Sequence, residues 1–275
     1  AITNRGYALP HGADLLNADA ITALLAPAVA QAVQITVVDR LPGTNAALRT
    51  QAANGAPEGL VLIAQAQSAG RGRRGHSFFS PPGGLYLSIL LRPAFSTRQS
   101  PQITALAAVA AARAAEQLCG TPIQIKWVND LWKNGKKVCG ILTEAGTDLE
   151  SGQLEWLVVG IGLNLTATAE DFPPELTAKA GSLYPGGPAP VSRAALAGAI
   201  GRELLALCPG FECLDEYRAR CFVPGHWVTV CTGTETYAAQ ALSIDDAGRL
   251  VVQREGGRIE ALRCGEVTIR PTKTD

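Results

Sequence analysis

The chain has 275 residues, of which 47% are hydrophobic and 17% charged, so it can form one large and one small domain with packed cores. Lysine plus arginine and aspartate plus glutamate both number 24, and this net charge of zero disfavours a dedicated nucleic-acid-binding protein. The seven cysteines form no C-x-x-C pair, which argues against a disulfide framework and a zinc site. Without a long apolar run or a signal peptide, the sequence predicts a cytoplasmic protein that does not contact membranes.

The first part of the chain is predicted to alternate short helices with apolar strands. Residues 1–34 form an N-terminal segment that contains a helix within 15–25. Thr44 is placed to cap a helix at 45–53. Apolar runs flanked by turn residues predict strands at 35–40, 59–67 and 85–92.

From Ser100 the pattern changes to a long alanine-rich helix. Ser100 is a suitable N-cap, Pro101 suits the first turn, and Gly120 ends the helix. An Asn-Gly pair at 134–135 predicts a tight hairpin turn. The other elements predicted in this region are strands at 123–128, 137–145 and 154–163 and helices at 193–207 and 211–220.

The chain after Pro224 has a different pattern of apolar and polar residues. Short alternating stretches separated by turns such as DDAG and EGG predict strands of a small barrel. The whole sequence therefore predicts an α+β fold: a mixed β-sheet flanked by helices at 35–222, followed by a small β-barrel domain at 223–275.

The loop GRGRRG, residues 70–75, matches the dinucleotide-binding pattern G-x-G-x-x-G. That function needs a helix directly after the glycines, whereas the stretch HSFFSPPGG follows here. A dinucleotide site is therefore rejected. Glycines let a backbone close around a ligand, and arginines present planar donors to a carboxylate or phosphate. The loop is predicted to order over a charged small molecule.

The hairpin at 134–135 also predicts a polar face. With Asn-Gly at the turn, Lys137 pairs across from Trp132, and Asp130 and Cys139 are expected on the same face. Lys137 is then either one solvated lysine of the charged turn WKNGKK or a functional cation. The residues alone leave both interpretations open.

Five stretches in a fixed order carry a resemblance that covers nearly the whole chain: SAGRGRRG at 68–75, KWVND at 126–130, KKVCGILTE at 136–144, GIGLN at 160–164 and GEVTIR at 265–270. Together they resemble the motifs of biotin protein ligases. The resemblance implies a class II synthetase-like biotin/lipoate ligase fold with a small SH3-like C-terminal domain. It also implies a reaction in which biotin and ATP, with Mg²⁺, form biotinyl-5′-AMP. The biotinyl group would then pass to a lysine of a biotin carboxyl carrier protein.

The resemblance also implies roles for individual residues. The loop at 68–75 would close over biotin and shield the reactive mixed anhydride from water. The catalytic residues would be Lys137, Arg71 and Arg73, with Asp130 as a candidate metal ligand. Biotin would contact Gly43, Thr44, Asn45, Gln67, Gly70, Arg71, Gly72, Arg73, Lys137 and Gly140. ATP and the adenylate would contact Arg73, Arg74, Phe78, Lys126, Asn129, Lys137 and Asn164.

The sequence departs from the family pattern at three positions. Gly43 stands where the family has the serine of S-T-N, and the missing hydroxyl should remove a hydrogen bond of about 0.5–1.5 kcal/mol. Val128 replaces the proline of K-W-P-N-D, which leaves the conformation of the turn before Asn129 open. Phe78 replaces a tryptophan of some relatives and offers the adenine a smaller aromatic surface.

Two other functions stay open from the sequence. A lipoate or octanoate ligase of the same fold is favoured by Gly43 alone, whereas the arginine loop and the terminal domain favour biotin. A non-catalytic repressor fragment that senses biotinyl-adenylate would need a DNA-binding domain. Residues 6–21 resemble the segment that leaves a winged-helix domain. Either that domain precedes residue 1, or the segment is a vestigial join in a ligase that binds no nucleic acid. Members of the family also dimerise through the central sheet, which implies a homodimer.

Overall fold

The computed structural model describes residues 2–3, 6–7, 14–92, 100–148, 153–207 and 213–270. Its centre is a seven-stranded sheet with the order β3-β4-β5-β9-β8-β7-β6. β3 and β4 are parallel and every other neighbouring pair is antiparallel, so the sheet is mixed, as predicted. The strands are β3 (Gln34–Leu41), β4 (Leu60–Gln67), β5 (Leu85–Leu91), β6 (Gln124–Lys126), β7 (Asp130–Lys133), β8 (Lys136–Thr147) and β9 (Leu154–Leu163). A separate short hairpin consists of β1 (Ile2–Thr3) and β2 (Gly6–Tyr7).

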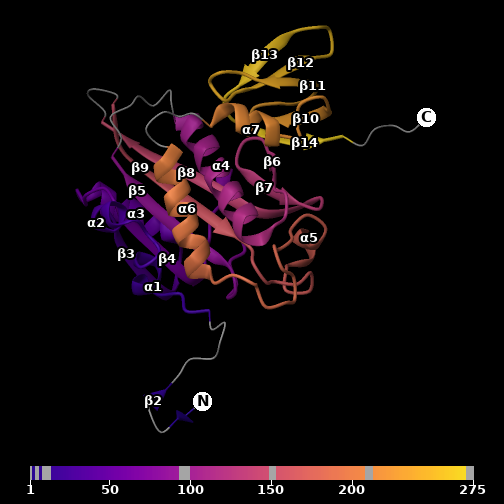
Figure 1. The fold of residues 1–275 in the computed structure, drawn as a ribbon. Coiled ribbons are helices and arrows are strands. Elements are labelled where there is room, and N and C mark those ends of the chain that lie inside the picture. Colours follow the sequence, from indigo (N-terminus) through magenta and orange to yellow (C-terminus); the bar gives the residue numbers. More distant parts are fainter. Residues whose placement is uncertain are drawn as a thin grey trace.

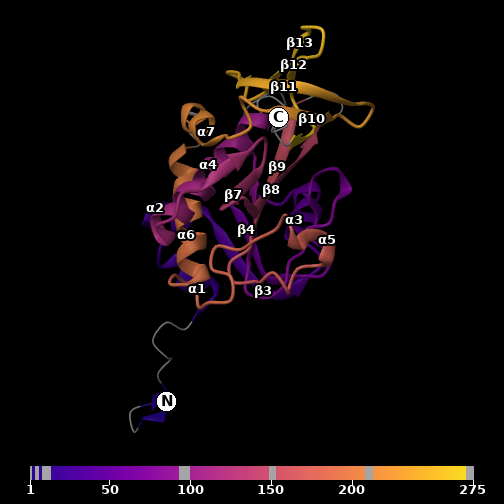
Figure 2. The ribbon, with the colours of Figure 1, turned by 90° about the vertical axis from the view of Figure 1, so that its right-hand side faces the viewer.

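Helices cover both faces of the central sheet (Figures 1 and 2). One face carries α1 (Ala18–Thr22), α2 (Pro27–Ala32), α4 (Ser100–Cys119) and α6 (Arg193–Leu207), and the other carries α3 (Thr44–Ala53). Strand β5 shows the alternation, because Leu87 and Ile89 pack toward α4 and α6 whereas Leu90 packs against α3. The alanines in the middle of α4 are almost fully buried, and their small side chains let this helix lie close to α6 and the sheet. No helix in the described part of the chain is long and apolar enough to cross a membrane.

The predicted strands and main helices of this domain are present, with ends that shift by a few residues. Helix α2 was not predicted. Thr44 does not cap α3: the helix begins at Thr44, and Gly43 holds the N-cap position without a side-chain bond. Gly120 follows α4 with a φ of +60°, as expected of a helix-ending glycine. The predicted capping by the Ser100 side chain lies outside the described residues.

The C-terminal strands form an open antiparallel sheet, not the closed barrel predicted from the sequence. In the described residues β14 pairs with β10 and not with β13, so the two ends of the sheet stay apart. Residues 265–269, which include β14, line the main pocket. The sheet has the order β13-β12-β11-β10-β14, with β10 (Trp227–Cys231), β11 (Thr236–Ile244), β12 (Leu250–Arg254), β13 (Ile259–Leu262) and β14 (Glu266–Ile269). Two short helical segments, η1 (Arg73–Gly75) and α5 (Pro174–Thr177), lie beside the same pocket.

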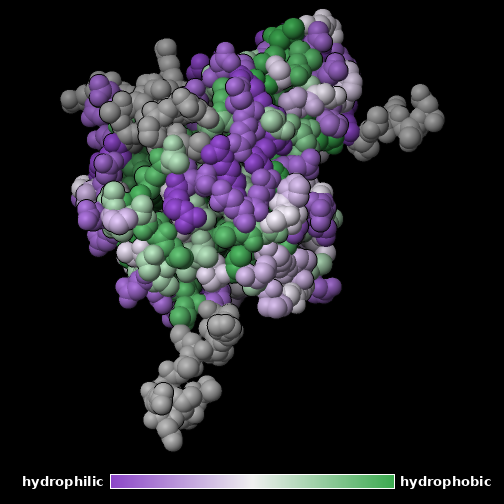
Figure 3. All heavy atoms as spheres, in the orientation of Figure 1, coloured by the Kyte–Doolittle hydropathy of each residue, from purple (hydrophilic) through white to green (hydrophobic). Residues whose placement is uncertain are grey.

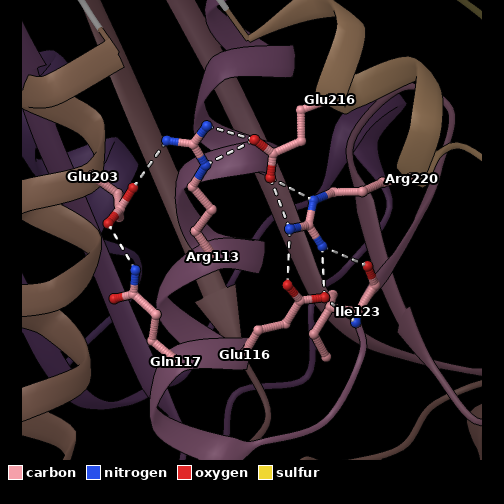
Figure 4. Close-up of polar contacts among 7 residues, drawn as sticks. All are labelled: Arg113, Glu116, Gln117, Ile123, Glu203, Glu216 and Arg220. Atoms are coloured by element: carbon pink, nitrogen blue, oxygen red, sulfur yellow. Dashed lines mark hydrogen bonds and ion pairs between the residues drawn. The ribbon is translucent and has the colours of Figure 1, made fainter.

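An ion-pair network fastens the last helix, α7 (Leu214–Arg220), to α4 (Figure 4). Arg113 donates to Glu216 at 2.8 Å. Arg220 lies 2.6 Å from Glu116 and 2.7 Å from Glu216. In the orientation of Figure 1, hydrophilic side chains form a band across the face of the molecule that is turned to the viewer (Figure 3). The network holds α7 between the central sheet and the C-terminal sheet.

Replacing Arg220 with glutamine should lower the free energy of unfolding by about 1–3 kcal/mol at neutral pH, because Glu116 and Glu216 each lose a charged donor. Hydrogen bonds from Arg220 lower the pKa of Glu116. Burial acts to raise the pKa of Glu216, but bonds from Arg113 and Arg220 outweigh it, so this pKa is lowered as well. Such carboxylates stabilise the fold above their unfolded pKa of about 4.3 and lose that contribution as the pH falls through the folded value.

The difference between the parent and Arg220→Gln should therefore shrink below about pH 4. Urea unfolding at neutral and acidic pH measures it. Arg263→Gln is the control, since Arg263 is exposed and has no ion pair among the described residues. An equal loss in the control, or a difference that persists in acid, would contradict the role of the network.

Candidate functional site

The floor of the main pocket is a patch of sheet without side chains. A pocket of about 1160 Å³ opens on the α3 face of the central sheet. Its floor lies where Gly140 of β8 pairs with Gly162 of β9, beside Gly160. A Cβ atom at Gly140 or Gly162 would lie 2.9 or 2.5 Å from the Phe78 ring, and one at Gly160 would overlap the Asn45 amide. The floor therefore needs glycine at these positions, and Phe78 and Asn45 lie directly on the backbone.

One end of the pocket is a network of polar side chains from α3, β4 and β5. Gln67 Oε1 accepts from Thr44 N at 2.8 Å and from Thr44 Oγ1 at 3.2 Å, and Gln67 Nε2 donates to Ser80 Oγ at 2.8 Å. The fully buried Ser88 hydroxyl lies 2.7 Å from Thr44 Oγ1 and 2.6 Å from Asn45 Oδ1, and can donate to either. These bonds hold the side chains at this end in fixed positions, as a pre-organised binding site requires.

The GRGRRG loop packs over the floor. Arg71 pairs with Ser77 in an isolated β-bridge, which folds the segment back on itself. Gly70 is closely surrounded, since a Cβ there would lie 2.5 Å from Phe78 O. Arg71 and Gly72 line the pocket. No hydrogen bond or ion pair engages the Arg71 guanidinium within the described parts of the chain, so it can meet an anionic ligand.

Arg73 and Arg74 tie the loop to other parts of the molecule. Arg73 donates to Asn129 Oδ1 and to Gly265 O, both at 3.3 Å, and burial lowers its pKa. Arg74 donates to Cys231 O at 2.7 Å. The loop is thus held against the C-terminal sheet, and Arg74, a predicted adenylate contact, is engaged there.

A β-bulge brings Lys137 to the pocket. Lys137 pairs with Trp132 as predicted, but the register shifts between Leu131 and Trp132, so that Cys139 pairs with Leu131. Cys139 is therefore fully buried in the core of the opposite face, and the prediction that it shares a face with Lys137 was wrong. Lys137 Nζ lies 2.8 Å from Asp130 Oδ1, an ion pair whose angles are not those of a hydrogen bond.

Further cationic and aromatic groups line the wall beside Lys137. The Lys137 ammonium lies 5.9 Å from the Phe78 ring centroid, and the Lys126 ammonium lies 5.4 Å from that of Trp132. Burial lowers the pKa of Lys126. The Trp132 ring packs edge-on against Phe222 at 5.8 Å. Ammonium groups held against aromatic faces can neutralise an anion, while the rings offer stacking surfaces.

The two predicted adenine-reading asparagines lie in different environments. Asn129 lines the pocket, donates to Ile141 O at 2.8 Å and accepts from Arg73. Asn164 does not line it: this side chain is buried and donates to Gly181 O at 3.0 Å. The peptide bond before Val128, in the turn that leads to Asn129, is cis.

The structure thus gathers the predicted site residues in one pocket, apart from Asn164. Those that line it are Gly43, Thr44, Asn45, Gln67, Gly70, Arg71, Gly72, Arg73, Arg74, Phe78, Lys126, Asn129, Asp130, Lys137 and Gly140. The sequence reasoning missed Ser80, Ser88, Gly160, Gly162 and Trp132. Three of these carry a signal: Ser88 interrupts an otherwise apolar strand, and the two glycines of GIGLN are two residues apart, on one face of β9.

The described residues contain no group of three or more His, Cys, Asp or Glu side chains placed to hold a metal ion. Asp130, the predicted ligand, pairs with Lys137. A single carboxylate of this kind suits Mg²⁺ only as an ion carried mainly by the phosphate oxygens of a substrate.

Comparison with known proteins defines the class. The family model described as the biotin/lipoate A/B protein ligase family matches residues 37–164, which include the floor, the arginine loop and Lys137. The chain is 34% identical over 232 residues to the bifunctional ligase/repressor BirA of Bacillus subtilis, covering 80% of this chain and 69% of that protein. It is 33% identical over 246 residues to the biotin--[acetyl-CoA-carboxylase] ligase of Mycobacterium tuberculosis, covering 85% and 88%.

A solved structure agrees with these sequence matches. The biotin protein ligase from Aquifex aeolicus, in complex with biotin and ATP, superposes with a TM-score of 0.69 at 25% identity. The match covers 87% of this chain and 99% of that one. The chain belongs to the biotin protein ligase family.

Proposed function

We propose that this chain is an ATP-dependent biotin–protein ligase. It joins biotin and ATP into biotinyl-5′-AMP and then transfers the biotinyl group to a lysine of a biotin carboxyl carrier protein. The observation that carries the proposal is the convergence of Arg71, Arg73 and Lys137 in the pocket that the Thr44 and Asn45 network closes at one end. One pocket thereby combines a polar end, where the Arg49–Glu144 ion pair backs Asn45, with a cationic centre.

The first step brings two anions together. A biotin carboxylate oxygen attacks the α-phosphorus of ATP, and the bond from that phosphorus to the pyrophosphate oxygen breaks. Arg71, Arg73 and Lys137 supply the positive charge that offsets the repulsion, so that most of the catalysis is positioning and electrostatic stabilisation. The ion pair with Asp130 holds the Lys137 ammonium over the pocket floor.

The second step releases AMP. The amine of the acceptor lysine attacks the biotinyl carbonyl carbon, the bond to the phosphate oxygen breaks, and the lysine loses a proton. Until the acceptor arrives, the arginine loop shields the mixed anhydride from water, because Arg73 bridges Asn129 and Gly265 above it.

The substrate contacts follow the geometry of the pocket. Thr44, Asn45 and Gln67 take the polar ring of biotin, and Phe78 and Asn129 lie at the adenylate end. Arg74 and Asn164 reach the adenylate only if they leave Cys231 O and Gly181 O. Mg²⁺ enters with ATP and neutralises phosphate charge, and Asp130 is the carboxylate nearest to Lys137 that could contribute a ligand.

Biotin-dependent exchange of pyrophosphate into ATP tests this function directly, with lipoate and octanoate run in parallel. We expect exchange with biotin alone. Exchange with lipoate or octanoate but not with biotin would identify the chain as a lipoate or octanoate ligase of the same fold. Tight binding of biotinyl-5′-AMP without exchange for any acid would indicate a non-catalytic sensor.

Replacing Lys137 with alanine should reduce the rate of adenylate formation at least about tenfold, because the pocket loses the ammonium that neutralises the reacting phosphate. Lys136→Ala is the matched control. Its ammonium donates to Thr177 O at 3.1 Å, and Lys136 does not line the pocket. The rate of biotinyl-5′-AMP formation in a single turnover is measured for both variants. A near-parental rate for Lys137→Ala would mean that Lys137 is only a solvated lysine of the charged turn.

Replacing Gly43 with serine should tighten biotin binding about twofold to tenfold, because the new hydroxyl can add one hydrogen bond. The site has room for it, since a Cβ at Gly43 would lie 3.7 Å from Ala69 O and 3.8 Å from Gln67 Oε1. Titration with biotin measures the change. Gly43→Ala adds the same Cβ without the hydroxyl. An equal gain in biotin affinity in both variants would show that the loss of backbone freedom on replacing glycine, and not the hydroxyl, causes the tighter binding.

A further inference from the structure

Helix α7 binds three different parts of the molecule with neighbouring side chains. Glu216 and Arg220 fasten it to α4 (Figure 4). Arg218 donates to Ile244 O at 2.9 Å, at the start of the turn between β11 and β12. The hydroxyl of Tyr217 donates to Val128 O at 2.9 Å. The helix therefore links α4, the C-terminal sheet and the turn that precedes Asn129.

The turn at 127–129 is held a second time from the C-terminal sheet. The indole Nε1 of Trp127 donates to Gly248 O at 3.1 Å. Gly248 belongs to the β11–β12 turn, in which Asp246 binds Arg218 at 2.5 Å. The contacts thus close a ring from α7 through the C-terminal turn and the turn at 127–129 back to Tyr217. Trp127 is 4% exposed and Tyr217 fully buried, so water does not replace either donor.

The held turn leads directly to two side chains of the pocket. Asn129 accepts from Arg73, and Asp130 pairs with Lys137 at 2.8 Å. A shift of the turn would move both partners and, with them, the two cations. The biotin end has bonds of its own, from α3 to β4 and β5 and from Asn45 to Leu142 O and Glu144 of β8, and none of these bonds reaches the turn at 127–129.

We propose that Tyr217 and Trp127 are positioning residues for the ATP end of the pocket, which fix the turn at 127–129 so that Asn129 and Asp130 present Arg73 and Lys137 to the phosphates. The inference rests on the proposed function. It makes the C-terminal sheet and α7 part of the support of the active site, although neither Tyr217 nor the bonded atoms of the β11–β12 turn touch the reacting groups.

The proposed positioning rests on the buried backbone carbonyl of Val128, which accepts a hydrogen bond from the Tyr217 hydroxyl. Burial raises the pKa of Tyr217 well above its usual value, so the phenol stays protonated and donates throughout the working pH range. Phenylalanine keeps the ring in place and removes the hydroxyl alone. The carbonyl of Val128 then loses its donor in a site that water does not reach, and the turn gains freedom to move.

Steady-state pyrophosphate exchange of the full chain, with ATP and biotin varied in turn, tests the proposal. Tyr217→Phe should raise the KM for ATP about fivefold to tenfold and leave the KM for biotin within about twofold, a difference of about 1–1.4 kcal/mol. Trp127→Phe should give the same pattern. Because both side chains hold one turn, the double variant should fall short of the product of the single effects.

Tyr237→Phe is the matched control. It also removes one phenolic hydroxyl, which binds Glu260 at 2.5 Å within the C-terminal sheet and away from the turn at 127–129. Both KM values should stay within about twofold of the parent. A merely structural role of Tyr217 would lower kcat in proportion to the folded fraction and leave both KM values unchanged.

Three outcomes would overturn the inference: an unchanged KM for ATP in both variants, an equal rise in the KM for biotin, or multiplicative effects in the double variant. If Tyr217→Phe does not fold by circular dichroism, Trp127→Phe decides alone. A parent chain without biotin-dependent exchange would instead contradict the proposed function, so the two failures are distinguishable.

Discussion

The pocket depends on the absence of side chains at the centre of the sheet. Gly140, Gly160 and Gly162 leave the backbone of β8 and β9 bare, so that Phe78 and Asn45 can lie on it within van der Waals contact. A Cβ at Gly140 or Gly162 would lift the Phe78 ring, and the arginine loop that leads to this ring would rise with it, whereas a Cβ at Gly160 would displace the Asn45 amide. Because the interior is closely packed, the position of Arg71 and Arg73 near Lys137 depends on these three glycines, although the glycines have no side chains of their own.

The sequence predicts what local pattern determines. The strands β3, β4, β5, β8 and β9 are found close to their predicted ranges because each is an apolar run bounded by turn residues. Features set by pairing over a distance were not predictable. The bulge that buries Cys139 depends on how β7 meets β8, and the open C-terminal sheet depends on β14 pairing only with β10. Which strand pairs with which, and in what register, cannot be read from a short stretch of sequence.

The site follows the same division. Arg71, Lys137 and Asn129 were predicted from motifs that occur in a fixed order along the chain, and all three line the pocket. Ser88 was missed because one serine in an apolar strand gains meaning only from its partners, which lie on α3, more than forty positions away. Asn164 shows the opposite case: its amide was predicted to read adenine, and in the structure it donates to the Gly181 carbonyl and does not line the pocket.

The bonds that close the arginine loop have a strength suited to a two-step reaction. Arg73 and Arg74 attach it through three hydrogen bonds, to Asn129, Gly265 and Cys231. At about 0.5–1.5 kcal/mol net each, they add up to a few kcal/mol. Under the proposed function, thermal motion would open such a lid often enough for an acceptor lysine to enter, yet keep it closed most of the time. A loop buried more deeply would protect the mixed anhydride better but would also exclude the acceptor, so moderate attachment to a second sheet serves both steps.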